Sequence, residues 1–98
     1  MAKIRFAGSG SADRHDIDHE DAEYAVRNHR LWIRRFDEPR APGLSRPDLF
    51  IGPDRSGRML EVMGNWLVDG DLELFHVMPL RDKTREKVRK HREEGNRR

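Results

Sequence analysis

The segment from Leu72 to Arg92 carries residue types suited to chemistry on a phosphate backbone. A strand-like run, Leu72 to Met78, contains His76 and is followed at once by Arg81 and a series of cations. A histidine can exchange a proton near neutral pH, and an arginine can bind a phosphate through two parallel N–H groups. The spacing therefore predicts a site that binds a phosphate backbone.

One reaction that such a site could catalyse is the cleavage of RNA through attack of a ribose 2′-hydroxyl on the adjacent phosphate. This reaction needs a base near the hydroxyl, an acid near the leaving oxygen, and cations to offset the charge of the transition state. His76 or Glu61 could exchange the proton. Arg81 and Arg55 could bind the phosphate, because both are expected where side chains reach past a sheet edge. The candidate catalytic residues are therefore Arg81, His76, Arg55 and Glu61.

Each of these four residues also has a purely structural explanation. Arg81 could be a solvated cation at a helix start, and Arg55 a turn residue paired with Asp54. His76 could be a buried neutral imidazole bonded to the backbone, and Glu61 an exposed carboxylate. A cutting centre requires the imidazole and the guanidinium to open onto one cleft.

The C-terminal tail is the strongest electrostatic feature of the chain. Residues 81–98 hold nine basic and four acidic residues, a net of +5, whereas residues 13–23 hold six acids and one arginine, a net of −5. Cations on several faces of a tail helix exclude a single membrane-binding stripe and favour RNA or a ribosomal surface. A solvated helix end is the alternative. The candidate RNA-binding residues are Arg58, Lys83, Arg85, Lys87, Arg89 and Lys90.

Aromatic residues and histidines elsewhere suggest two further kinds of site. Trp32, Trp66 and Phe75 could stack on bases, but aromatic residues within strands more often belong to the core. His15 and His19 have the spacing by which one helix face can hold a metal, yet no third ligand is compelling. We expect no metal and no cofactor.

Length and composition predict one domain with a small core. The chain has 98 residues, of which 35% are hydrophobic and 39% charged. We expect a single domain over residues 1–98, with a flexible linker over 8–14 and a charged tail over 82–98. The chain has no cysteine, no membrane-length apolar run and no signal-peptide core, which favours a cytoplasmic protein without contact to a membrane.

Hydrophobic patterning predicts an α+β fold. The expected strands cover residues 3–7, 30–36, 49–51, 59–66 and 72–78, and the last three form an antiparallel meander. The expected helices run from Asp16 or Asp18 to about Asn28 and from Lys83 to Glu94. The last strand should be central, because it is apolar on both sides. Strict alternation places Leu72, Leu74, His76 and Met78 on one face and Phe75 and Val77 on the other.

Two stretches resemble the BrnT-like toxins of toxin–antitoxin pairs, a branch of the RelE fold group. The first reads Phe-Ile-Gly-Pro-Asp-Arg-Ser-Gly-Arg-Met-Leu-Glu-Val from Phe50 to Val62, and the second reads His-Val-Met-Pro-Leu-Arg from His76 to Arg81. The stretch around His15 is similar to the histidine that leads into that group's first helix. The chain departs from the pattern in having Asp16 where glycine is usual, in a longer proline-rich stretch over 39–47, and in a more charged tail.

The resemblance implies a small twisted antiparallel sheet with an N-terminal helix packed on it and a basic C-terminal helix, as in RelE-like proteins. It implies a type II toxin, a metal-independent endoribonuclease that cleaves mRNA and inhibits translation. Its partners would be RNA, either free or on the ribosome, and a cognate antitoxin, a small DNA-binding protein from an adjacent gene. Two alternatives remain open: a non-catalytic RNA- or ribosome-binding module, and a small interaction protein whose acidic helix and basic tail pair with a neighbour.

Overall fold

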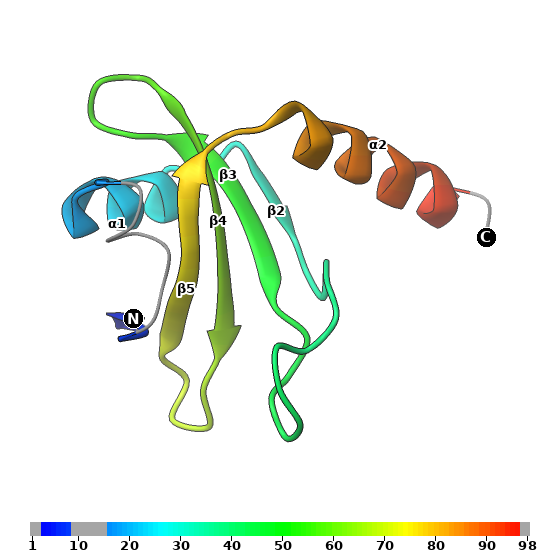
Figure 1. Cartoon of the computed structure of the whole chain (residues 1–98), viewed down its shortest axis with the longest axis horizontal. Coiled ribbons are helices and arrows are strands. Elements are labelled where there is room, and N and C mark those ends of the chain that lie inside the picture. Colours follow the sequence, from blue (N-terminus) through cyan, green and yellow to red (C-terminus); the bar gives the residue numbers. More distant parts are fainter. Residues whose placement is uncertain (1–2, 9–15, 97–98) are drawn as a thin grey trace.

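The computed structural model describes residues 3–8 and 16–96, and within them five strands form one mixed sheet flanked by two helices (Figure 1). The strands are β1 (Ile4–Phe6), β2 (Leu31–Ile33), β3 (Asp48–Pro53), β4 (Met59–Trp66) and β5 (Leu72–Pro79). The helices are α1 (His19–Arg27) and α2 (Asp82–Asn96). Neither helix is long and apolar enough to cross a membrane within this described part. The expected linker over 8–14 lies outside the described residues, apart from Gly8.

The predicted meander is confirmed, because β3, β4 and β5 are antiparallel neighbours in the sheet order β1-β5-β4-β3-β2. The prediction of a wholly antiparallel sheet is wrong. β1 pairs with β5 in parallel, with Ile4 opposite Leu72, so β5 lies inside the sheet as expected. β2 is shorter than predicted, and Arg35 shortly after it has a positive φ of 53° that turns the chain away from the strand direction.

A β-bulge corrects the predicted faces of β5. Met63 pairs with His76 but the next residue, Gly64, pairs with Leu74, so Phe75 is an extra residue in β5. Leu74 and Val77 therefore share one face, and His76 lies on the other. The expectation that Leu74 and His76 share a face is wrong because strict alternation assumes a regular strand.

The first face of the sheet packs against α1. Ala22, Ala25 and Val26 of the helix meet strand residues in the larger hydrophobic core, whose other fully or nearly buried members are Ile17, Phe50, Leu60, Val62, Leu72, Leu74 and Val77. The approach is close at Gly52, where a Cβ atom would collide with the backbone oxygen of Ala25. Small residues on both α1 and β3 thus allow the helix to lie close to the sheet.

The second face of the sheet carries a smaller core that includes one residue of α2. Val88 packs with Ile33, Phe36, Leu49 and Ile51. Figure 1 shows α2 leaving the end of β5 and running away from the strands over its later turns. The helix is therefore attached mainly through its first half, where Thr84 and Val88 are buried and Lys83 and Arg85 are exposed.

Candidate functional site

A fully buried carboxylate, Glu61, lies at the centre of the candidate site. It is on β4, opposite Met78 of β5, on the face of the sheet that carries the smaller core. Its side chain is 0% exposed, so the expectation of a solvent-facing glutamate is wrong. A buried carboxylate is costly unless its oxygens are bonded, and this one has several donors.

The donors to Glu61 come from β5 and from the start of α2. Its Oε1 accepts the backbone N–H of Arg81 at 2.9 Å and Nε–H of the same residue at 3.1 Å. Its Oε2 is 2.8 Å from Nη2 of Arg81 and 2.8 Å from Nε2 of His76. The hydroxyl of Thr84 also donates to this carboxylate. Glu61 thus brings the predicted imidazole and guanidinium to one oxygen atom.

These contacts fix the charge of Glu61. Burial alone raises the pKa of Glu61, but hydrogen bonds from His76, Arg81 and Thr84 outweigh burial and lower the pKa to about 2. The same carboxylate raises the pKa of Arg81. At neutral pH the carboxylate is ionised and its lone pairs are occupied, so it is not placed to accept a proton from a substrate. Its geometry fits a positioning role.

His76 is the residue of the cluster that could exchange a proton. Its Nε2 faces an ionised carboxylate, so this nitrogen carries the hydrogen and Nδ1 carries the lone pair in the neutral ring. The side chain is 18% exposed, so it is partly rather than fully sealed. The partner of Nε2 is a side-chain carboxylate, and not the backbone group that a purely structural role for His76 predicts.

A cationic cavity of about 370 Å³ lies next to Glu61. Lys87 in its wall is 3.1 Å from a carboxylate oxygen of Asp37 and lies over the ring of Phe36. The Arg81 side chain is 34% exposed, so part of its guanidinium is available to an anion. The lining residues are Phe36, Asp37, Glu61, Met63, Arg81, Lys83, Thr84 and Lys87.

Arg55 is not brought together with this cluster. It lies in the turn between β3 and β4, and its guanidinium contacts Glu20 at 2.7 Å and Asp21 at 2.8 Å, with Asp18 at 3.3 Å. These acids belong to the start of α1, which packs on the opposite face of the sheet from Glu61. The hydrogen bond from Arg55 lowers the pKa of Asp21. Arg55, one of the four candidate catalytic residues, therefore lies apart from His76, Arg81 and Glu61.

The predicted RNA-binding cations divide into paired and exposed residues. Arg58 binds Asp54 at 3.2 Å, so the expected partner of Arg55 is taken by Arg58 instead. Arg89 is bonded to Glu86 and Glu93 on α2, and the ion pair with Glu86 raises its pKa. Lys87 is exposed but pairs with Asp37, and the remaining predicted cations of α2, Lys83, Arg85 and Lys90, are exposed.

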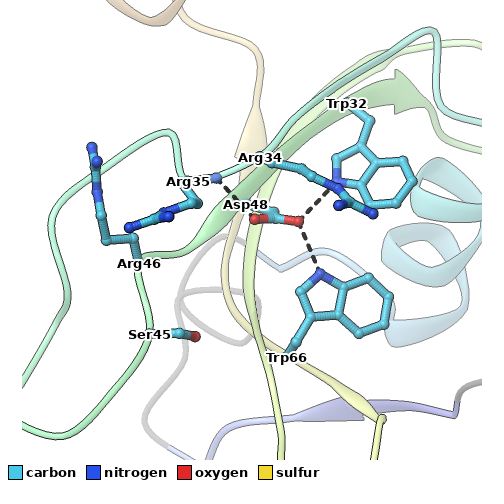
Figure 2. Close-up of a pocket in the computed structure, with 7 residues that line it drawn as sticks. All are labelled: Trp32, Arg34, Arg35, Ser45, Arg46, Asp48 and Trp66. Carbon is cyan, nitrogen blue, oxygen red and sulfur yellow. Dashed lines mark hydrogen bonds between the residues drawn. The ribbon is translucent and has the colours of Figure 1, made fainter.

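A second arrangement, which the sequence did not lead us to expect, joins three adjacent strands (Figure 2). Asp48 of β3 accepts the indole N–H of Trp32 from β2 at 2.9 Å and that of Trp66 from β4 at 2.8 Å, both at Oδ2. Its Oδ1 accepts the backbone N–H of Arg35 at 3.0 Å. Asp48 is buried, whereas the tryptophans are 37% and 41% exposed, so the expectation that both belong to the core is wrong.

The only sequence signal for this arrangement is a carboxylate placed directly before a buried apolar strand. Asp48 precedes Leu49, Phe50 and Ile51, and such a residue must find donors if it is buried. Nothing in the strand pattern says that the donors are two indoles.

Comparison of the chain with protein-family models, with curated proteins and with solved structures finds no match to any of them. Among the described residues, no group of three or more His, Cys, Asp or Glu side chains is arranged to hold a metal ion. His15, one of the two histidines considered as metal ligands, lies outside the described residues. The function must therefore be argued from the site itself.

Proposed function

We propose that this chain is the toxin of a type II toxin–antitoxin system, an endoribonuclease that cleaves mRNA and inhibits translation. The observation that carries the proposal is the contact of His76 and Arg81 with the same oxygen of buried Glu61, each at 2.8 Å. A proton-exchanging ring and a phosphate-binding guanidinium are thereby neighbours beside a cationic cavity. The resemblance to BrnT-like toxins supports the same conclusion.

In the proposed reaction, Nδ1 of His76 takes the proton of the 2′-hydroxyl as its oxygen attacks the adjacent phosphorus. The new bond joins the 2′-oxygen to phosphorus, and the bond between phosphorus and the 5′-oxygen breaks. The leaving oxygen takes a proton from the imidazolium or from water, which gives a 2′,3′-cyclic phosphate and a 5′-hydroxyl. Ionised Glu61 stabilises the imidazolium, and Arg81 with Lys83 offsets charge on the phosphate.

A non-catalytic RNA- or ribosome-binding module is the second candidate, and two observations favour it. Arg81 already gives two side-chain N–H groups to Glu61. His76 lies beside the cavity and does not belong to its lining. A module of this kind would use the same cations on α2 without cutting the strand.

The experiment that separates the two candidates is cleavage of a labelled mRNA by the purified chain, alone and with ribosomes. We expect 2′,3′-cyclic phosphate ends, and a loss of rate of about 10²- to 10⁴-fold in His76→Gln. His91→Gln is the matched control, because His91 lies on α2 against Phe36 and outside the cluster. RNA that is bound but intact with wild-type protein would replace the toxin proposal by the binding module.

We further propose a cytoplasmic location and neutralisation by a small DNA-binding antitoxin from an adjacent gene. Growth arrest on expression of the chain alone, relieved by co-expression of that neighbour, is the expected result. Copurification of the two proteins checks the contact. Unimpaired growth and intact mRNA on expression of the chain alone would contradict the toxin assignment.

A further inference from the structure

The two exposed tryptophans form a rigid surface that the proposed cleavage does not use. Trp32 and Trp66 lie on the α1 face of the sheet with their ring centroids 6.3 Å apart. Each indole N–H is held by buried Asp48, and Trp32 also stacks on Phe50 at 5.4 Å. Rings fixed in this way lose little conformational entropy when a ligand packs on them.

Cations surround one side of this indole pair. A groove of about 680 Å³ is lined by Arg34, Arg35 and Arg46 together with Trp32, Trp66 and other residues. Figure 2 shows Arg34 beside the Trp32 ring and Arg46 on the far side of Asp48. The guanidinium of Arg34 lies 5.0 Å from the Trp32 ring centroid. Asp48 is buried and already accepts three N–H groups, so the accessible charge of the groove is positive.

The other side of the indole pair is mainly apolar. A second groove, of about 390 Å³, is also lined by Trp32 and Trp66, and its other residues are Ile4, Val26 and Phe50 with Arg27 and His29. The two grooves therefore meet at the indoles. A ligand that fits both has a planar apolar part and an adjoining anionic part, and a nucleotide has this combination.

We infer that this surface, which we call the indole groove, binds a nucleotide unit of single-stranded RNA. The base packs on the exposed indole surface, and Arg34 and Arg46 bind the flanking phosphates. The indole groove lies on the opposite face of the sheet from Glu61, so it is an anchoring site and not part of the cleavage centre. The inference does not depend on cleavage.

Intrinsic fluorescence gives a direct test, because the chain has two tryptophans and both lie in the indole groove. The probe is an octamer of adenosine nucleotides with 2′-O-methyl ribose, which cannot be cleaved by 2′-hydroxyl attack. We expect it to quench the tryptophan emission of the full chain and to bind more weakly as salt rises. Adenosine monophosphate and a glutamate octapeptide are titrated in parallel.

Variants of Trp66 and Arg34 link the binding to the indole groove. Trp66→Leu should weaken octamer binding by about 5- to 150-fold, the range for loss of one stacked base, while Trp66→Phe retains most of the affinity. Arg34→Gln should reduce the slope of log affinity against log salt by about 0.7. Arg40→Gln is the matched control, because the Arg40 guanidinium lies over the ring of Phe75 and beside Glu73 of β5, outside the lining of both grooves. Thermal unfolding confirms that each variant is folded.

Three outcomes would overturn the inference. The first is an emission unchanged by the octamer, or an affinity unaffected by both Trp66→Leu and Arg34→Gln in folded protein. The second is equal or tighter binding of the glutamate peptide, which would indicate an acidic protein partner. The third is binding of adenosine monophosphate as tight as that of the octamer, which would indicate a free nucleotide. Failure of mRNA cleavage leaves all of these measurements interpretable, because the octamer cannot be cut.

Discussion

Replacing Glu61 by glutamine tests whether the buried carboxylate holds the candidate site together. Glutamine keeps the shape of the side chain but removes the charge that His76 and Arg81 face. Lowering the pKa of Glu61 from its ordinary value of 4.5 to about 2 corresponds to about 3 kcal/mol of folded-state stabilisation. This is a substantial share of the roughly 5–15 kcal/mol by which a domain is stable.

The pH dependence follows from the direction of this shift. A carboxyl group whose pKa is lower in the folded state contributes its full stability above its unfolded pKa, and this contribution is lost as pH falls towards the folded pKa. For Glu61 the loss runs from about pH 5 down to about pH 2. The Glu61→Gln variant has no charge to lose at this position. The difference in stability between the two proteins should therefore shrink as the solution is acidified.

Urea unfolding followed by far-UV circular dichroism at several pH values checks this expectation. The free energy of unfolding of Glu61→Gln should be lower than that of wild type by about 3 kcal/mol at pH 7, and by roughly half of that at pH 3. Other acidic groups, such as Asp21 beside Arg55, titrate in both proteins and largely cancel in the difference. A difference that is the same at both pH values would refute the reasoning, because it would mean that the pKa of Glu61 is the same in the folded and unfolded protein.

Three further substitutions test the packing around the two sites. Gly52→Ala should cost about 1–3 kcal/mol of unfolding free energy through its collision with α1, whereas Gly8→Ala, which has open space around it, should leave the urea midpoint unchanged. Val88→Ala should cost about 2 kcal/mol and speed hydrogen exchange in α2, because Val88 is the main apolar contact of this helix. Asp48→Asn should cost about 1–3 kcal/mol and shift the tryptophan emission to the red, because an amide has a single acceptor oxygen and cannot accept the two indole N–H groups and the backbone N–H of Arg35 together.

The local parts of the fold could be predicted from the sequence, and the non-local parts could not. The meander follows from apolar runs separated by turns such as Asp69-Gly70, where the glycine has a positive φ of 92°. The pairing of Ile4 with Leu72 joins residues from opposite ends of the chain, and no local pattern specifies it. The parallel edge of the sheet was missed for this reason.

Three of the four candidate catalytic residues, His76, Arg81 and Glu61, lie together in the structure, but the sequence did not predict their geometry. His76 and Arg81 were chosen for their chemistry, and for Glu61 an exposed carboxylate was the alternative because exposed glutamates are common. The extra residue at Phe75 places His76 on the same face as Glu61, and a bulge leaves no clear mark on the apolar pattern. Arg55 could not be placed, because its three acidic partners lie more than thirty positions away in the sequence.

Three carboxylates are buried among the described residues. Asp54 accepts backbone N–H groups of its own turn, whereas Glu61 and Asp48 need an explanation beyond stability. Glu61 and Asp48 lie on opposite faces of the sheet, and each accepts at least three hydrogen bonds. Burying a charge costs free energy that its partners only offset, and an apolar residue of similar volume is often no less stabilising. What each carboxylate does achieve is orientation: Glu61 fixes an imidazole and a guanidinium, and Asp48 fixes two indoles with their rings exposed. Binding and reaction both depend on how the side chains of a site are oriented. Substitutions of Glu61 and Asp48 should therefore impair function in protein that is still folded.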